Sequence, residues 1–189
     1  MTTTQILSFK RGAMVATAAP FAGKLWTPPT NERGWNAVEG QNGSLVEPAI
    51  KSKHGKKPAA GAVVVEPDGR VWLVEPAGAF GGYKYTFPKG KLDGAASPQA
   101  TAIREVFEES GLKAEIVDLI GDFERDTSVT RYYLARRVAG VPGQCDAETA
   151  AVHLVPLARL DQWLTHKNDR PVVAALAACI ARRALKGAA

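Results

Sequence analysis

The chain has 189 residues, of which 46% are hydrophobic and 23% charged, and its net charge is +5. This length suits one domain with an appendage, and the composition excludes a disordered or fibrous chain. No apolar run reaches the roughly 18 residues of a membrane span. Two cysteines, Cys145 and Cys179, are too few for a disulfide framework, so we expect a reducing, cytoplasmic location and no membrane partner.

Residues 1–56 are predicted to form an irregular N-terminal extension. Prolines, glycines and two tryptophans, Trp26 and Trp35, interrupt a segment with little periodicity, apart from a short strand expected near residues 5–9. Because aromatic side chains favour burial, we expect the extension to pack on the domain or on a second subunit, which leaves a homodimer open. For the basic run at residues 51–57, a solvated linker is favoured over contact with nucleic acid or an anionic substrate.

Residues 57–189 are predicted to form the main domain, in which strands and helices alternate. β-Branched runs around a Pro-Asp-Gly turn predict a hairpin of residues 62–65 and 71–74. Further strands are expected at residues 83–87, 114–124, 130–137 and 152–155, and helices at 97–110, 157–164 and 169–185. Periodicity alone indicates a mixed α/β or α+β domain.

The most informative element is the expected helix that Ser97 caps and Gly111 ends. Glu105, Glu108 and Glu109 fall within about a 100° arc of one helix face. A solvated surface is the ordinary interpretation of such a face. Like charges at this spacing weaken a helix by a few tenths of a kcal/mol per pair, and a bound divalent cation would reverse that effect.

This stretch resembles the signature of the Nudix hydrolases, G-x5-E-x7-R-E-U-x-E-E-x-G-U, in which U is aliphatic. The positions that match are Gly90, Arg104, Glu105, Val106, Glu108, Glu109, Gly111 and Leu112. Ala96 stands where the family has its first glutamate, a departure expected to affect loop rigidity more than metal binding, and Asp93 is a candidate substitute. Over about residues 57–187, the resemblance implies the Nudix fold, a mixed β-sheet sandwiched between α-helices.

The resemblance also implies a Mg²⁺-dependent (or Mn²⁺-dependent) hydrolase that cleaves a phosphoanhydride bond. Glu105, Glu108 and Glu109 are then the carboxylate ligands. The backbone carbonyl of Gly90 is expected to join them, because a residue without Cβ lets the backbone approach closely. A metal that bridges phosphates neutralises charge and orients water for in-line attack.

Two residues beside the carboxylates are assigned catalytic roles by the same resemblance. Arg104 is expected to orient the catalytic Glu105 through a salt bridge, although an ordinary surface arginine is the alternative. The general base is either Glu105 or Glu148, and Glu148 lies in a loop before the strand at residues 152–155. A loop carboxylate without a catalytic role is the alternative for Glu148.

Candidate substrate contacts are Lys89, Lys91 and Arg131, whose cationic groups can reach phosphate oxygens. Residues 87–91 resemble the segment before the signature in Nudix enzymes that act on dinucleoside or diphosphoinositol polyphosphates. We therefore expect a nucleoside diphosphate linked to another moiety, foremost a dinucleoside polyphosphate. ADP-ribose, nucleotide sugars and nucleoside triphosphates stay open, as does a nucleotide-binding protein with little turnover, which Ala96 favours.

Overall fold

The computed structural model describes residues 4–12, 25–51, 55–94 and 96–187, so the basic run predicted at residues 51–57 lies partly outside the described residues. The strands are β1 (Leu7–Lys10), β2 (Lys57–Val64), β3 (Arg70–Pro76), β4 (Lys89–Lys91), β5 (Leu112–Glu124), β6 (Ser128–Gly140) and β7 (Thr149–Pro156). The helices are α1 (Glu32–Asn36), α2 (Pro98–Ser110), α3 (Leu160–Trp163) and α4 (Arg170–Gly187), with short 3₁₀ turns at Ala77–Gly82 and Leu157–Arg159. Within these described ranges, no helix is both long and apolar enough to cross a membrane.

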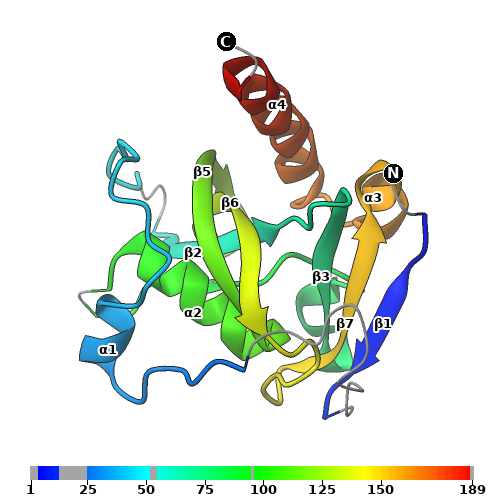
Figure 1. The fold of residues 1–189 in the computed structure, drawn as a ribbon, viewed down its shortest axis with the longest axis horizontal. Coiled ribbons are helices and arrows are strands. Elements are labelled where there is room, and N and C mark those ends of the chain that lie inside the picture. Colours follow the sequence, from blue (N-terminus) through cyan, green and yellow to red (C-terminus); the bar gives the residue numbers. More distant parts are fainter. Residues whose placement is uncertain (1–3, 13–24, 52–54, 95, 188–189) are drawn as a thin grey trace.

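The strands form two sheets (Figure 1). The larger sheet has the order β4-β2-β6-β5, with β2 and β6 parallel and the other pairs antiparallel. The smaller sheet has the order β1-β7-β3 and is antiparallel. The expected mixed sheet with helices packed on it is confirmed.

Strand β2 is covered on both faces, which explains its nearly unbroken run of hydrophobic residues. Ala60, Ala62 and Val64 belong to the cluster of buried side chains that includes α2. Val63, which points the other way, belongs to a second cluster with Leu176 of α4. Because successive side chains of a strand alternate between faces, α2 and α4 must cover opposite faces of the sheet.

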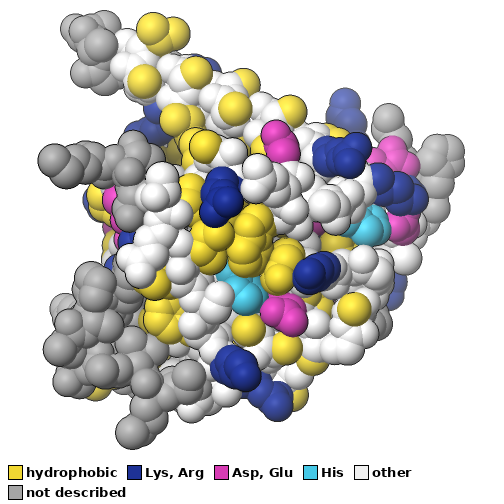
Figure 2. Space-filling view, turned by 90° about the vertical axis from the view of Figure 1, so that its right-hand side faces the viewer, with side chains coloured by type: hydrophobic (Ala, Val, Ile, Leu, Met, Phe, Trp, Pro, Cys, Tyr) yellow, Lys and Arg dark blue, Asp and Glu magenta, His cyan; other side chains and the backbone are white. Residues whose placement is uncertain are grey.

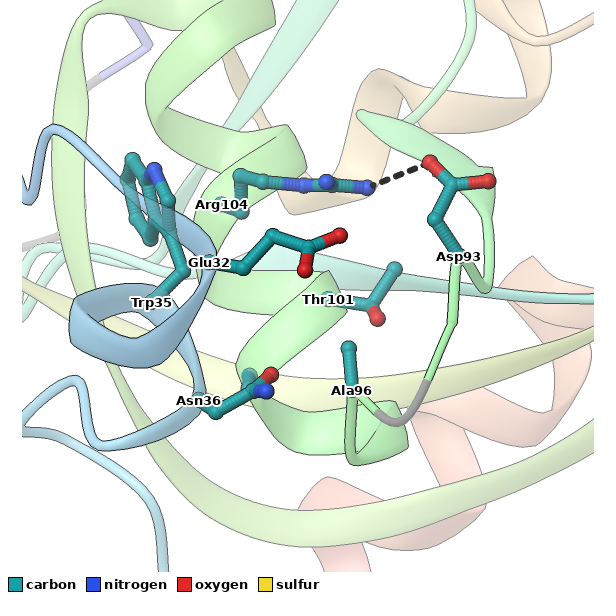
Figure 3. Close-up of a pocket in the computed structure, with 8 residues that line it drawn as sticks. Glu32, Trp35, Asn36, Asp93, Ala96, Thr101 and Arg104 are labelled. Carbon is teal, nitrogen blue, oxygen red and sulfur yellow. Dashed lines mark hydrogen bonds and ion pairs between the residues drawn. The ribbon is translucent and has the colours of Figure 1, made fainter.

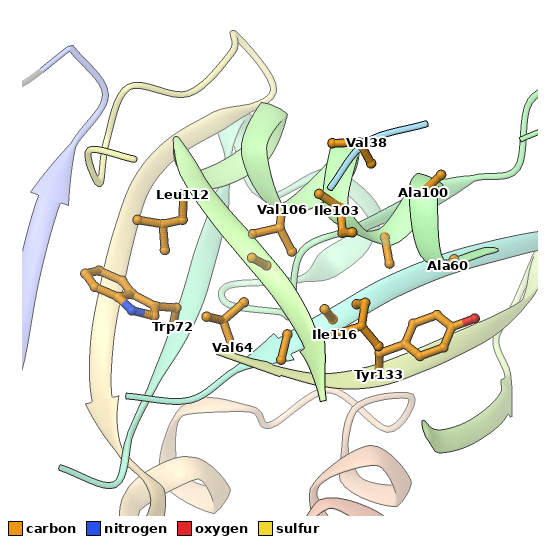
Figure 4. Close-up of a cluster of buried hydrophobic side chains, with 14 of the residues drawn as sticks. Val38, Ala60, Val64, Trp72, Ala100, Ile103, Val106, Leu112, Ile116 and Tyr133 are labelled. Carbon is orange, nitrogen blue, oxygen red and sulfur yellow. The ribbon is translucent and has the colours of Figure 1, made fainter. Parts of the chain in front are cut away.

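The core on the α2 side joins the two sheets (Figure 4). Trp72 of β3, Ile103 and Val106 of α2, and Leu112 of β5 are each at most 1% exposed. Full burial of one such aliphatic side chain stabilises the fold by roughly 1.5–3 kcal/mol. This packing fixes the rotation of α2 about its axis and so decides which of its residues face β4.

The hairpin predicted for residues 62–65 and 71–74 is wrong. Both strands exist, but they belong to different sheets and share only the isolated bridge between Val65 and Val71. Both runs are buried, and each strand pairs with neighbours in its own sheet. The turn between them carries the chain from the larger sheet to the smaller one. The strand predicted at residues 83–87 is reduced to one bridge between Thr86 and Val74.

The described part of the N-terminal extension packs on the domain. Strand β1 pairs with β7, close to the short strand expected at residues 5–9. Trp26 and Trp35 both contact Phe107 of α2, with ring centroids 5.1 and 6.2 Å from it. Residues 25–51 therefore cover a flank of α2 that the sheets leave open, as Figure 1 shows.

On the side of the smaller sheet, a buried histidine links three strands. The two ring nitrogens of His153 in β7 form hydrogen bonds with the Ser8 hydroxyl of β1 at 2.8 Å and with the Glu75 carboxylate of β3 at 3.0 Å. The rings of Tyr85 and Trp163 pack beside it. Figure 2 views this side, where hydrophobic side chains gather next to histidine and acidic groups.

Candidate active site

Helix α2 begins and ends where its local sequence predicts. The Ser97 hydroxyl caps the helix by accepting a hydrogen bond from the backbone N–H of Ala100 at 3.0 Å, and Pro98 follows in the first turn. Gly111 ends the helix in the left-handed region with φ 78°. These caps fix where the helix begins and ends, and thus the positions of the three glutamates along it.

Gly90 lies against the carboxylate of Glu105. Strand β4 pairs with β2 through Gly90 and Ala60, and this pairing brings the glycine up to α2. A Cβ atom built on Gly90 would overlap the carboxylate atoms of Glu105. Glycine therefore leaves room for this carboxylate in its present position, whereas coordination of a metal ion by the Gly90 carbonyl stays a prediction.

The acidic cluster, Glu105, Glu108 and Glu109, holds negative charge that the protein neutralises only in part. Burial raises the pKa of Glu109 to about 8, and the negative charge of Glu105 adds to the effect against the opposing charge of Lys89. Burial likewise raises the pKa of Glu105 to about 7, with Arg104 opposing and Glu108 adding. Glu109 also accepts a hydrogen bond from the backbone N–H of Lys89 at 3.0 Å.

Arg104 connects the acidic cluster to the loop before α2. Its Nη2 donates to Glu105 and to Asp93, each at 3.2 Å, and its Nε lies 3.8 Å from a carboxylate oxygen of Glu108. The salt bridge expected between Arg104 and Glu105 is present. Asp93, the candidate substitute for the missing glutamate at Ala96, contacts the same guanidinium.

The loop before β7 brings two more carboxylates near the acidic cluster. The backbone N–H of Asp146 donates to the carbonyl of Glu108 at 2.8 Å. Burial raises the pKa of Glu108, and the charges of Asp146 and Glu148 raise it further. Glu148 is exposed to water, and its effect on Glu108 places it near the acidic cluster. Asp146 was missed by the sequence reasoning, although its place two residues before Glu148 was the signal for it.

The donor set fits a hard divalent cation. No three acidic, histidine or cysteine side chains in the described part of the chain are arranged as a complete ion site. In the acidic cluster, burial and mutual repulsion nevertheless raise the pKa values of Glu105 and Glu109. Gly90, which has no side chain, leaves space beside the Glu105 carboxylate. Oxygen donors with excess negative charge are what Mg²⁺ and Mn²⁺ prefer, and Glu105, Glu108, Glu109 and the Gly90 carbonyl could hold such an ion.

The two lysines that flank Gly90 lie at the site. Lys89 is half-buried, and its positive charge partly offsets the rise in the pKa values of Glu105 and Glu109. Its ammonium also lies 5.7 Å from the centre of the Tyr83 ring. Lys91 is exposed at the end of β4. Lys89 is therefore placed where a phosphate near the acidic cluster could meet it, while the role of Lys91 stays a prediction.

The structure does not bring Arg131 to this site. Its side chain is 2% exposed and donates to both carboxylate oxygens of Asp122, at 2.7 and 2.8 Å. It also donates to Glu47 at 3.1 Å and to the carbonyl of Pro48 at 2.7 Å. The guanidinium is buried and occupied by protein acceptors, so we leave Arg131 out of the proposed substrate contacts.

Arg125, in the turn between β5 and β6, lies against the Tyr83 ring that Lys89 also approaches. It donates to Asp169 and to the Tyr132 hydroxyl, each at 2.9 Å, and its guanidinium lies 5.1 Å from the centre of the Tyr83 ring. The ammonium of Lys89 lies near the same ring. Strand β4, the segment before it and the turn between β5 and β6 thus bring two cations and an aromatic ring together, and this tertiary grouping is not evident from local sequence patterns.

Comparison with known proteins agrees with this geometry. Residues 55–176 match the family model described as the NUDIX domain. Over 68 residues, the chain is 37% identical to an RNA pyrophosphohydrolase of Caulobacter vibrioides, a match that covers 36% of this chain and 38% of that protein. The curated relatives are thus matched over less than half of their own length.

Solved structures share the fold. The crystal structure of a MutT NUDIX hydrolase from Burkholderia pseudomallei superposes with a TM-score of 0.54 at 27% identity, covering 63% of this chain and 96% of that chain. A C. elegans Ap4A hydrolase superposes with a TM-score of 0.52 at 20% identity, covering 65% and 98%. Since the family model matches more than half of the sequence and spans β4, α2 and the acidic cluster, the chain belongs to the NUDIX domain family.

Proposed function

We propose that this protein is a Mg²⁺-dependent (or Mn²⁺-dependent) hydrolase that cleaves a phosphoanhydride bond in a nucleoside diphosphate linked to another moiety. The observation that carries the proposal is the acidic cluster, in which Glu105 lies against Gly90, Glu109 accepts a hydrogen bond from the backbone N–H of Lys89, and burial raises the pKa of both glutamates. A structural role would favour neutralised carboxylates, because unpaired buried charge destabilises a fold.

The acidic cluster and the Gly90 carbonyl would hold the cation, and Lys89 and Lys91 would contact phosphate oxygens. When bound, the ion would neutralise phosphate charge and lower the pKa of a bound water. Arg104 fixes the orientation of Glu105, since the Nη2 hydrogen bond at 3.2 Å restrains the carboxylate next to Gly90. Preorganisation of this kind avoids reorientation of the ligand during the reaction.

Glu105 and Glu148 are the two candidates for the general base. Glu105 is 13% exposed and shares a hydrogen bond with Arg104, whereas Glu148 is exposed on the loop beside Glu108. An exposed carboxylate near the cation site can take a proton from water and release it to solvent. Replacement of each glutamate by glutamine separates the two, because only loss of the base removes the lower-pH limb of the pH–rate profile at saturating metal.

We propose a dinucleoside polyphosphate or a related polyphosphate as the substrate. Tyr83 offers a ring beside Lys89, and the ring is also stacked with His166 at a centroid distance of 3.9 Å. An aromatic ring next to cations suits a base joined to phosphates. Because the Caulobacter vibrioides relative is named an RNA pyrophosphohydrolase, RNA is a second candidate substrate.

A substrate panel tests the proposal. Dinucleoside polyphosphates, nucleotide sugars, ADP-ribose, nucleoside triphosphates, triphosphorylated RNA and inositol pyrophosphates would be incubated with Mg²⁺ or Mn²⁺, in ¹⁸O-labelled water, and the products identified by mass spectrometry. We expect metal-dependent incorporation of the label into one phosphate product, abolished in E108Q/E109Q and retained in E115Q. Glu115 is a suitable control because it forms an exposed ion pair with Arg136 on β5 and β6. Turnover that survives in E108Q/E109Q would contradict the site assignment.

The remaining proposals concern location and assembly. The structure contains Cys145 and Cys179 as free thiols, which suits the proposed reducing, cytoplasmic location. A homodimer stays a prediction that light scattering can test. The alternative of a nucleotide-binding protein with little turnover rests on Ala96, and a large gain in turnover number in Ala96→Glu would favour it.

A further inference from the structure

A cavity of about 70 Å³ lies between the N-terminal extension and the start of α2 (Figure 3). Its walls include Glu32 of α1, Asp93 and Ala96 of the loop, and Thr101 and Arg104 of α2. A water molecule takes up about 30 Å³ in the liquid, so the cavity has room for more than one.

Two of the residues that line this cavity each have a buried polar atom without a hydrogen-bond partner in the protein. They are Arg104, through its Nε, and Thr101, through its hydroxyl. A carboxylate oxygen of Glu108 lies 3.8 Å from the Nε, which is beyond hydrogen-bond reach. Ala96 offers only a methyl group to the same cavity. Buried polar groups are normally satisfied by protein or ordered water, so these two call for an acceptor within the cavity.

Glu32 is positioned to supply that acceptor. Figure 3 shows its carboxylate between Arg104 and Thr101, pointing into the cavity. The carboxylate also lies over the loop before α2, since a Cβ built on Gly94 would be 3.8 Å from Glu32 Oε1. Helix α1, which carries Glu32, is fixed by the packing of Trp35 on Phe107.

We propose that Glu32 is a positioning residue for the proposed hydrolase site, and that it restrains Arg104 through water held in the cavity. The Nη2 of Arg104 already binds Asp93 and Glu105, so an acceptor for Nε would fix the plane of the guanidinium and with it the carboxylate of Glu105. Water-bridged contacts restrain polar groups nearly as well as direct hydrogen bonds. The N-terminal extension therefore supplies a carboxylate on the side where Ala96 has none.

This inference rests on the proposed function, and a rescue experiment tests it. Glu32→Gln should lower kcat about tenfold with KM within twofold, as expected for loss of a group that orients a ligand through another residue. Adding Ala96→Glu to that variant places a carboxylate in the same cavity and should restore most of kcat. Glu39→Gln is the matched control, because Glu39 lies on the same extension and pairs with Lys113 instead.

Two further measurements separate positioning from folding and from failure of the site. The melting temperature of Glu32→Gln should stay within about 2 °C of the wild type, and NMR should show faster exchange of the Arg104 Nε–H. Unchanged kcat in Glu32→Gln, with activity abolished in E108Q/E109Q, would overturn the role of Glu32 and leave the proposed function standing. Activity that survives E108Q/E109Q would instead overturn the proposed function.

Discussion

Two clusters of charged side chains in this protein differ in how far their positive and negative charges neutralise each other. In the arginine cluster, Arg131 is held by Asp122 and Glu47, and the Tyr133 hydroxyl also donates to Glu47 at 2.6 Å. Every charged group there has a partner. In the acidic cluster, one guanidinium and one ammonium face three glutamates, and the pKa values of the glutamates rise.

The difference is our reason for proposing different roles for the two clusters. The arginine cluster, whose charges are paired, ties the N-terminal extension to β5 and β6. In the acidic cluster, a bound cation would offset the repulsion between the carboxylates, and for that reason we propose this cluster as the cation site. The following predictions test this contrast, from the largest expected effect to the smallest.

Glu109→Gln should lower kcat on the order of 10³-fold, because loss of a cation ligand removes several kcal/mol of transition-state stabilisation. Above about pH 8, the same variant should be at least as stable as the wild type without metal, since it then removes a buried charge. Steady-state kinetics with the best substrate of the panel, together with thermal unfolding in a chelator, would measure both. A destabilised and fully active variant would show that Glu109 is structural.

Arg131→Met should destabilise the fold by about 1–3 kcal/mol, because it removes a buried guanidinium that bonds Asp122, Glu47 and the carbonyl of Pro48. The kcat of the folded fraction should change little. Arg136→Met is the control on the same strand, since its ion pair with Glu115 is exposed and worth about 0–1 kcal/mol. Urea unfolding would compare them, and equal losses of stability would contradict the structural role of Arg131.

Gly90→Ala should reduce kcat about 10- to 100-fold while the protein stays folded. The added methyl would meet the Glu105 carboxylate, which is the end of a flexible side chain and can move aside. The cost therefore falls on the ligand geometry rather than on the backbone. Gly43→Ala is the control, because a Cβ at Gly43 meets nothing within 4 Å. Wild-type kcat in Gly90→Ala would refute the close approach.

Stability of the metal-free protein should fall as pH rises from about 4.5 to about 8. Folding raises the pKa of Glu105 from 4.5 to about 7 and that of Glu109 to about 8, so across this range the folded state holds protons that the unfolded chain releases. Thermal unfolding in a chelator would follow the trend. Mg²⁺ should restore stability mainly at the alkaline end, and a pH-independent effect of Mg²⁺ would contradict the assignment.

Local signals predicted α2 well. The hydroxyl of Ser97, the ring of Pro98 and the αL glycine at Gly111 act within a few residues of the helix ends, so they can be read directly from sequence. Gly90 and the glutamates followed from the resemblance to the Nudix signature. These parts of the fold and site depend on short-range chemistry or on a fixed spacing.

Long-range pairing decided what the sequence could not predict. The predicted hairpin of residues 62–65 and 71–74 failed because the partners of each strand lie far along the chain. Arg131 is neutralised by Glu47, which is 84 residues away in sequence. Glu32 reaches the cavity beside Arg104 on a segment whose local sequence carries no catalytic pattern. A charged residue can be identified locally, but whether it is neutralised depends on the tertiary fold.

The most direct test of the central claim is the binding of Mn²⁺ to the metal-free protein, followed by electron paramagnetic resonance. The account predicts that the wild type binds the ion and that E105Q/E108Q/E109Q does not, while E115Q binds as the wild type does. Circular dichroism would verify that the triple variant is folded. Wild-type affinity for Mn²⁺ in the folded triple variant would contradict the assignment of the acidic cluster as the cation site.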